Sequence, residues 1–345
     1  MRIFALVKRI ILQMFRDKRT LALLFLAPLL VLTLMYLIFD SDDAEMNLGI
    51  VGSNEILEES LQEQGIKIEE FKGANEDTIL SNNLDGLLEI TADGAVLTLQ
   101  NSNPSEARGL LAGVSQAIIL QGQGADSQSL TLPRLETDYL YGNENTELFD
   151  VIGPILVGFF VFFFVFLISG IGLLKERVSG TLERVLATPV KRWEIVAAYL
   201  TGFGIFAIIQ TAIVVLYSIH ILDMVMEGSV WHVFIINLLL ALVALSLGIL
   251  LSTFAGSEFQ MVQFIPLVIV PQIFFSGIFP IEGMADWLQN VGRTMPLYYG
   301  ADALKGVMYR GESLFEVADN LIVLALFAFL FITLNILALK RYRKL

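Results

Sequence analysis

Long apolar stretches dominate the chain and alternate with shorter polar ones. Runs without Asp, Glu, Lys or Arg, each long enough to cross a bilayer, occur at 21–39, 151–174, 195–219, 230–254, 261–281 and 320–339. The pattern predicts a polytopic α-helical membrane protein with six transmembrane helices. We expect the fifth helix to be kinked, because Pro266, Pro271, Gly277 and Pro280 interrupt its run.

Residues 40–150 break this pattern and indicate a separate α/β domain between the first and second transmembrane helices. Short strands are predicted at 47–51, 66–71, 84–90 and 95–99, helices at 55–64 and 105–121, and a polar loop at 121–129. Before them stand the acids Asp40, Asp42, Asp43 and Glu45. We interpret these acids as a solvated boundary rather than a cation site, because ligand count alone is weak evidence.

Charge is distributed unevenly between this domain and the rest of the chain. The net charge is −13, but residues 40–150 hold 22 acidic and 4 basic residues, a balance of −18, so everything else sums to +5. An acidic domain beside a basic-flanked membrane body disfavours nucleic-acid binding.

The basic residues also predict the orientation. Lys and Arg number six in 1–20, five in 175–194 and four in 340–345, which makes 15, against 7 in the segments on the other side. Both termini, including the basic tail 340–345, and the 175–194 segment are therefore expected in the cytoplasm, and 40–150 outside. The first apolar run follows a basic region as a signal peptide does. No small-x-small cleavage site follows it, so we expect an uncleaved helix.

Residues 1–20 predict an amphipathic helix. One face carries Ile3, Val7, Ile10, Met14 and Phe15, and the other carries Arg2, Arg9, Gln13 and Arg16. This pattern is typical of an interfacial helix on the inner leaflet. A cytoplasmic extension of the first transmembrane helix is the alternative.

The polar segment 175–194 separates the second and third apolar runs and predicts a second short amphipathic helix. Val178, Leu182, Val185 and Leu186 share one face at helical spacing. Gly180 loosens its start, and Thr188-Pro189 are predicted to open the next helix. Such a helix presents a surface to a partner; a plain interfacial turn is the alternative.

Sequence motifs for catalysis are missing. The chain has no G-x-x-x-x-G-K-[ST], no H-E-x-x-H, no G-x-S-x-G and no cysteine. G-F-G-I-F-A at 202–207 matches a dinucleotide pattern by accident inside an apolar run, where its glycines favour close helix packing. The polar residues within the runs are mostly amides and hydroxyls, and we expect them to bridge helices. No catalytic residue, metal site or cofactor is predicted.

Three segments resemble the ABC-2 type exporter permeases. They are KERVSGTLERVLATPVKRWEIVAAYL from Lys175, FFSGIFPIEGMADWLQNVGRTMPLYYGADALKGV from Phe274 and RDKRTLALLFLAPLL from Arg16. With the six runs and the domain after the first, the resemblance covers nearly the whole chain. The large 40–150 domain is similar to that of the linearmycin and daunorubicin resistance permeases.

The resemblance implies a multi-pass protein of a prokaryotic plasma membrane that exports an amphipathic or lipid-like compound. Its 175–194 helix would dock on a separate ATPase subunit that holds ATP and Mg, and a second permease would complete the transport path. The docking residues implied are Arg177, Val178, Gly180, Leu182, Glu183, Arg184, Val185, Leu186 and Pro189.

The resemblance also implies a pair of short re-entrant helices at 282–319, closing the outer end of the path. The external gate residues would be Ser276, Gly277, Pro280, Trp287, Pro296 and Tyr298.

Two other classes of protein are alternatives to the exporter. A non-transport membrane scaffold or receptor, resembling phage-infection or secretion-accessory proteins, would share the layout without needing a docking helix. A membrane-embedded enzyme is disfavoured, because a nucleophile, a base and metal ligands are missing from the motifs.

Overall fold

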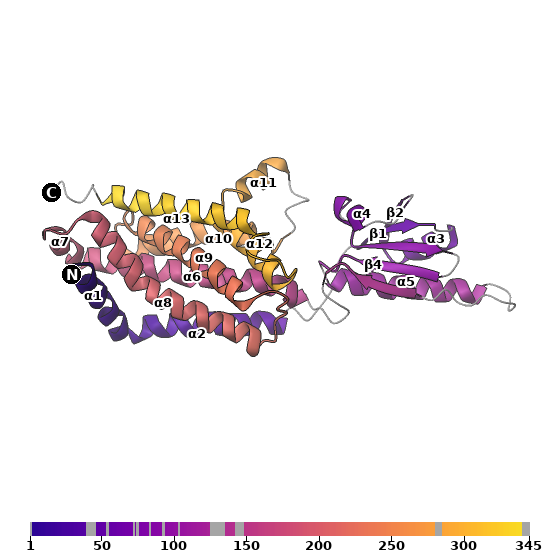
Figure 1. The fold of residues 1–345 in the computed structure, drawn as a ribbon, viewed down its shortest axis with the longest axis horizontal. Helices are drawn as coiled ribbons and strands as arrows, with labels where there is room; N and C mark the ends of the chain where they lie inside the picture. Colours follow the sequence, from indigo (N-terminus) through magenta and orange to yellow (C-terminus); the bar gives the residue numbers. More distant parts are fainter. Residues whose placement is uncertain are drawn as a thin grey trace. The chain divides into compact units, whose positions relative to one another are not determined.

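The computed structural model describes residues 2–38, 46–52, 55–71, 73, 76–82, 84–91, 94–102, 104–124, 135–141, 148–279 and 285–339. The chain divides into two compact units (Figure 1). Residues 37–151 form the smaller unit, and residues 1–36 together with 152–345 form the larger one.

The smaller unit is a five-stranded mixed sheet with helices. Its strands are β1 (Met46–Val51), β2 (Ile66–Glu70), β3 (Gly86–Thr91), β4 (Gly94–Leu99) and β5 (Leu135–Tyr139), in the order β2-β1-β3-β4-β5. All neighbouring pairs are parallel except the β3–β4 pair, which is antiparallel. The helices are α3 (Glu55–Glu63), α4 (Glu76–Ser81) and α5 (Pro104–Gly124).

The α/β character predicted for this unit is confirmed. Alternate residues of β4 are buried in a core that also contains Leu110 and Val114 of α5, as expected for a sheet covered by a helix. Strand β5 and helix α4 are short, and the sequence pattern does not predict them. The predicted loop at 121–129 starts too early, because α5 continues to Gly124. The acids at 40–45 lie outside the described residues.

The larger unit is helical. Its elements are α1 (Arg2–Arg16), α2 (Lys18–Ile38), α6 (Leu148–Val178), α7 (Thr181–Leu186), α8 (Arg192–His220), α9 (Val230–Ser252), α10 (Glu258–Phe274), α11 (Asp286–Gly292), α12 (Pro296–Met308) and α13 (Ala318–Ala338). Among the described residues, α2, α6, α8, α9 and α13 are long and apolar enough to cross a membrane.

The remaining predicted span, 261–281, is only partly helical. Helix α10 starts earlier, at Glu258, and ends at Phe274 after 17 residues, which is shorter than the other five. Its N-terminus is capped by Ser257, whose hydroxyl accepts a hydrogen bond from the Gln260 N–H at 3.2 Å. Beyond its C-terminus the backbone turns at Gly277, where φ is +91°.

Helix α6 is the buried centre of the bundle. Within its apolar stretch, 89% of the residues are buried, against 17% for α2 and α13. Phenylalanines dominate this stretch, and Phe162 and Phe166 are fully enclosed. A helix that is apolar on all sides lies either among other helices or in lipid, and α6 lies among other helices.

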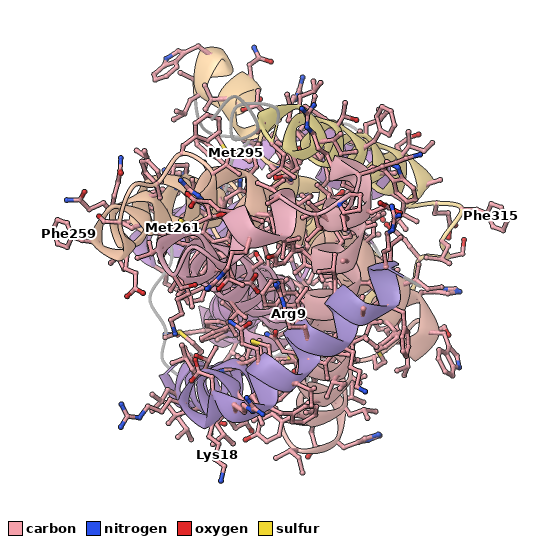
Figure 2. The ribbon with its side chains drawn as sticks, turned by 90° about the vertical axis from the view of Figure 1, so that its left-hand side faces the viewer. Arg9, Lys18, Phe259, Met261, Met295 and Phe315 are labelled. Carbon is pink, nitrogen blue, oxygen red and sulfur yellow. The ribbon has the colours of Figure 1, made fainter. Side chains whose placement is uncertain are left out.

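Helix α1 is the amphipathic helix that the sequence predicts, and its position on a membrane surface stays a prediction. Its face with Val7, Ile10 and Met14 is buried and packs on α8. Phe15 contacts the ring of Phe206 on α8 edge-to-face, with 5.6 Å between centroids. Figure 2 shows α1 crossing the end of the bundle, with Arg9 turned inward and Lys18 outward.

Close helix packing depends on particular glycines. A Cβ at Gly248 of α9 would approach the Phe166 carbonyl oxygen of α6 to 2.5 Å, and one at Gly202 would lie 2.8 Å from Ile10. At Gly204 a Cβ would meet only Leu245, at 3.8 Å, which is ordinary contact. The expectation that both glycines of 202–204 serve packing therefore holds for Gly202 alone.

We predict that Gly248→Ala destabilises the bundle, because its methyl group must push α9 away from backbone atoms of α6. Overpacking of this kind costs about 1–3 kcal/mol. Gly204→Ala is the matched control, since alanine favours a helix by ~1 kcal/mol and has room here. Thermal unfolding of the purified protein in detergent measures both. Equal losses of stability for the two variants would contradict this packing.

Candidate functional site

The connection between α6 and α8 is the segment predicted to contact a partner. Helix α6 continues to Val178, and the chain then reverses at Gly180, where φ is +68°. Helix α7 follows with only six residues. Helix α8 starts at Arg192, and the Glu194 carboxylate accepts a hydrogen bond from the Lys191 N–H at 2.6 Å. Thr188 and Pro189 therefore do not open α8, contrary to the sequence prediction.

The apolar face predicted for this segment is divided in the structure. Leu182 is 1% exposed and packs into the bundle beside Ile195, Val196 and Tyr199 of α8. Val178, by contrast, is 63% exposed, because it belongs to α6 and the turn at Gly180 breaks the helical phase. Leu182 anchors α7 inside the protein and is not available to a partner's groove.

Other residues of the segment remain accessible. Glu183, Arg184, Thr188 and Pro189 are exposed, while Val185 and Leu186 are half-buried. A depression of about 150 Å³ beside α7 is lined by residues that include Arg177, Val178, Glu183, Leu186 and Gly256. The accessible surface is therefore a mixture of charged and apolar groups around one shallow hollow.

Arg177 connects this segment to the end of α9. Its guanidinium donates hydrogen bonds to the backbone carbonyls of Ser252 and, at 2.8 Å, of Ala255. The last carbonyls of a helix lack partners within it and carry partial negative charge, so a cation stabilises them. Arg177 thus fixes the end of α6 against α9 instead of facing a partner freely.

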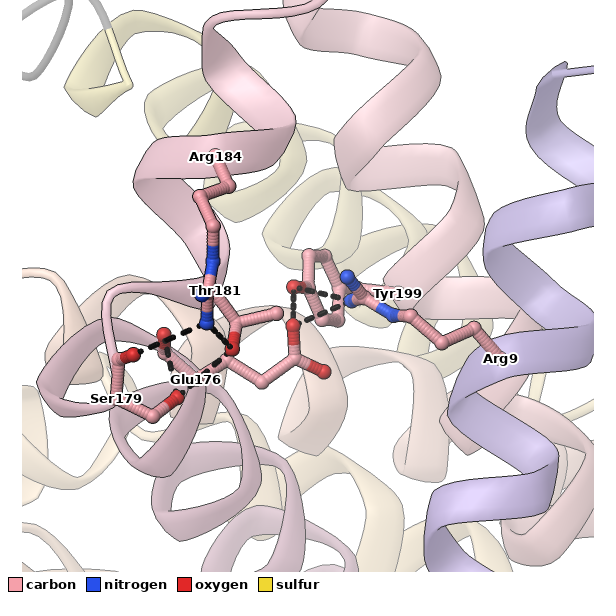
Figure 3. Close-up of polar contacts among 6 residues, drawn as sticks. All are labelled: Arg9, Glu176, Ser179, Thr181, Arg184 and Tyr199. Atoms are coloured by element: carbon pink, nitrogen blue, oxygen red, sulfur yellow. Dashed lines mark hydrogen bonds and ion pairs between the residues drawn. The ribbon is translucent and has the colours of Figure 1, made fainter.

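A buried polar cluster lies at the end of α6, a few residues before α7 (Figure 3). Glu176 is 2% exposed, and its Oε2 accepts hydrogen bonds from the Arg9 guanidinium of α1 and from the Tyr199 hydroxyl of α8. Arg9 also donates to the Tyr199 oxygen at 3.1 Å. A buried carboxylate requires such partners. The cluster therefore joins α1, α6 and α8 at the base of α7.

Sequence reasoning missed this cluster. Arg9 was assigned to the polar face of α1, and Glu176 to the polar segment outside the helices. The two residues are 167 positions apart, so no local spacing connects them. The available signal was weak: Tyr199 is a hydroxyl-bearing residue near one end of an otherwise apolar run.

A second ion pair lies where α1 meets α2. Asp17 accepts hydrogen bonds from the Thr20 hydroxyl at 2.7 Å and the Thr20 N–H at 3.2 Å, and it pairs with Lys175 at 3.2 Å. These donors hold the pKa of Asp17 below its ordinary value. Asp17 therefore caps α2 as a carboxylate and links it to the end of α6.

The predicted outer gate contains two short helices, as expected. Pro296 starts α12, and Gln272 of α10 accepts a hydrogen bond from the Leu297 N–H at 2.9 Å. Ser276 is buried and donates to the Ile273 carbonyl at 2.8 Å, and Gly277 forms the turn after α10. These residues join α10 to α12. The structure does not test whether they gate a path.

The aromatic residues of this region differ in their surroundings. Trp287 of α11 is exposed, whereas Tyr298 is half-buried and packs edge-to-face on Tyr299. Pro280 lies outside the described residues.

Buried amides bridge helices elsewhere, as predicted. The Asn335 side chain of α13 donates to the Ser246 carbonyl of α9 at 2.7 Å, and Gln210 of α8 donates to the Phe160 carbonyl of α6 at 3.4 Å. No group of three or more potential metal-ligating side chains occurs within the described part of the chain.

The fold is that of a polytopic helical membrane protein. At one end of its helical bundle, the α6–α8 connection is held in place by buried contacts. Residues 18–337 match the model of the ABC-2 family transporter proteins, so the chain belongs to that family. The family resemblance inferred from the motifs is confirmed.

Named relatives agree with this assignment. ABC transporter G family member 20 of Dictyostelium discoideum is 25% identical over 90% of this chain and 46% of its own length. Inner membrane transport permease YhhJ of Escherichia coli is 30% identical over 51% of this chain and 47% of its own. The probable multidrug ABC transporter permease YbhR of the same species is 25% identical over 52% and 49%. The chain thus spans about half the length of these relatives.

We predict that Arg9→Ala destabilises the protein, because it leaves Glu176 buried without its cation. Breaking a buried pair costs about 3–5 kcal/mol, and the low end applies here since Arg9 keeps 30% of its side chain exposed. Arg16→Ala removes an exposed arginine from the same helix and is the control. Adding Glu176→Gln to Arg9→Ala should recover part of the loss in a thermal unfolding assay. No difference between Arg9→Ala and Arg16→Ala would contradict the cluster's role.

Proposed function

We propose that this chain is the membrane subunit of an ATP-driven exporter and that the α6–α8 connection is where the ATPase subunit docks. The observation that supports this proposal is that the connection is fixed from inside and exposed on its outer surface. Glu176, Arg177 and Leu182 hold it firmly to α1, α8 and α9, yet Glu183 and Arg184 remain exposed. A short, rigid, mixed-polarity helix suits a groove on another protein.

The docking residues divide into two groups in this proposal. Val178, Glu183, Arg184, Leu186 and Pro189, with the half-buried Val185, form the contacting surface. Arg177, Gly180 and Leu182 position that surface from inside. The chain itself binds no cofactor, and ATP and Mg belong to the partner subunit.

The proposed topology has six spans, and α10 belongs to the fifth of them, 261–281. Fifteen of the 22 Lys and Arg residues lie in 1–20, 175–194 and 340–345. This bias supports a cytoplasmic location for both termini and for α7, and an external location for the 40–150 domain. The prokaryotic plasma membrane fits the bacterial relatives.

A second permease is proposed to complete the transport path, as a homodimer or a homologous heterodimer. Helix α10 supports this with a strongly exposed apolar face that includes Phe259, Val262 and Leu267. Figure 2 shows Phe259 projecting away from the bundle. Lipid is the other environment that such a face accepts.

The proposed substrate is an amphipathic or lipid-like compound. The word multidrug in the name of one relative supports drug or antibiotic efflux. The acidic 40–150 domain, with its balance of −18, suits guidance of cationic or amphipathic cargo. A solubilising cap without cargo contact is the alternative for this domain.

A non-transport scaffold or receptor remains the second candidate function. The sharpest difference between the two lies in the partner. An exporter subunit needs a soluble ATPase with G-x-x-x-x-G-K-[ST], for instance from a neighbouring reading frame, and a scaffold does not.

We predict that Arg184→Glu weakens ATPase association by at least about tenfold, ~1.4 kcal/mol, without affecting membrane insertion. Among the described residues, Arg184 donates hydrogen bonds only to Ser179 and Thr181 of its own segment, at 3.4 and 3.3 Å, so the fold does not depend on it. Arg293→Glu reverses another exposed arginine, after α11, and serves as control. The measurement is ATP hydrolysis that copurifies with the tagged chain from its native membrane.

Two outcomes would contradict this account in different ways. Full association of the Arg184→Glu variant would exclude the α7 surface as the docking site. Absence of any copurifying ATPase from the unmodified chain would favour the scaffold.

A further inference from the structure

A cavity of about 270 Å³ lies at the same end of the bundle as the Glu176 cluster. Its walls come from α1, the start of α2, α6, α8 and the start of α10. An engineered cavity of about 150 Å³ binds benzene in another protein. The space here therefore suits a single ring or a single alkyl chain, and it is too small for a two-chain lipid.

The two ends of the cavity differ in chemistry. Ile168 and Ile171 of α6, Met14 of α1 and Phe203 of α8 supply apolar walls. Phe203 is itself buried and stacks on Tyr199, with 6.1 Å between ring centroids. An aromatic wall of this kind accepts both alkyl groups and cations.

The polar end carries an excess of negative charge. Asp17, Glu176 and Glu258 line the cavity, and Lys175 is the one basic residue among its lining groups. Lys175 is occupied by Asp17 at 3.2 Å. Behind the lining, Arg9 pairs with Glu176. Counting all five groups, the balance is −1.

Two carboxylates that line the cavity, Glu176 and Glu258, can each accept a further hydrogen bond or ion pair. Both hydrogen bonds that Glu176 accepts go to Oε2, and its Oε1 has no partner among the described residues although the side chain is 98% enclosed. Glu258, in the first turn of α10, has no ion-pair partner in the described part of the chain. In the described part of the chain, Oε1 is not among the fully buried oxygens that lack a hydrogen bond, and Glu258 is exposed, so both carboxylates are open to a ligand in the cavity. A cation in the cavity would pair with both.

We propose that this cavity binds a cationic amphipath with one ring or one chain. Its cationic group lies between Glu176 and Glu258, and its apolar part lies along Ile168, Ile171 and Phe203. An anionic head group would meet three carboxylates, and a neutral one would gain no charge attraction from them. The binding site stands independently of transport; only the further step of treating its ligand as cargo rests on the proposed function.

The test uses the absence of cysteine from the chain. Gln13→Cys places one thiol on the cavity lining, at an exposed position of α1. The protein is reconstituted in phosphatidylcholine nanodiscs without ATPase or nucleotide. The rate of alkylation by N-ethylmaleimide is then measured with octyltrimethylammonium, octyl glucoside or octyl sulfate below their micellar concentrations.

Octyltrimethylammonium should slow alkylation saturably, while the other two probes should have little effect at the same concentration. Glu258→Gln should weaken this protection roughly fivefold, as expected for one charge near the surface. Asp319→Asn, an exposed carboxylate at the start of α13, should leave protection unchanged. Ile171→Trp should abolish protection by filling the cavity.

Equal protection by all three probes, or none by the cation, would overturn the proposal. A thiol that is already protected and forms a disulfide-linked dimer on oxidation would overturn it too, by assigning the cavity to a second copy of the chain. Because the assay contains no ATPase, its failure is distinct from failure of the exporter function.

Discussion

The burial of Glu176 constrains the rest of the larger unit. A carboxylate enclosed to this degree is unfavourable unless its charge is paired and hydrogen-bonded, and Arg9 and Tyr199 supply both. These partners come from α1 and α8. If α1 left the bundle, the carboxylate would lose its cation. Such a pair contributes little net stability, but it strongly disfavours other arrangements of the three helices.

Helix α7 depends on this arrangement, because it follows Glu176 by only a few residues. Leu182 enters the bundle beside Tyr199, and Arg177 holds the carbonyls at the end of α9. The short helix is thus attached to α6, α8 and α9, although six residues alone would not stay helical in water. A force applied to its exposed surface would reach the long helices directly. Rigid attachment is what coupling between a soluble ATPase and membrane helices requires.

Much of this fold could be predicted from local sequence patterns. Five apolar runs became long helices, and four strands of the α/β unit lie close to their predicted positions, because burial patterns at period 2 and 3.6 are local signals. Element ends were less predictable. Helix α6 continues to Val178, which placed Glu176 inside a helix and removed Val178 from the face of α7.

The site was predictable as a segment but not as a set of contacts. The spacing of Val178, Leu182, Val185 and Leu186 suggested one continuous face, and the turn at Gly180 divides it. Arg9, the cationic partner of Glu176, lies 167 residues away from it. Ser252, whose carbonyl accepts from Arg177, lies 75 residues away. Contacts over such separations depend on how helices cross, which periodicity does not encode. For the same reason, the packing of α1 on α8 is not predictable from the sequence of α1.

The central claim is that the exposed residues of the α6–α8 connection, such as Arg184 and Thr188, contact the ATPase, while the buried Leu182 does not. Single cysteines at Leu182, Arg184 and Thr188, each labelled with a photoreactive maleimide in membranes that contain the ATPase subunit, test this claim directly. The account predicts crosslinks to the ATPase from Arg184→Cys and Thr188→Cys, and slow labelling without crosslinks from Leu182→Cys, which is buried. Crosslinks from Leu182→Cys alone would contradict it.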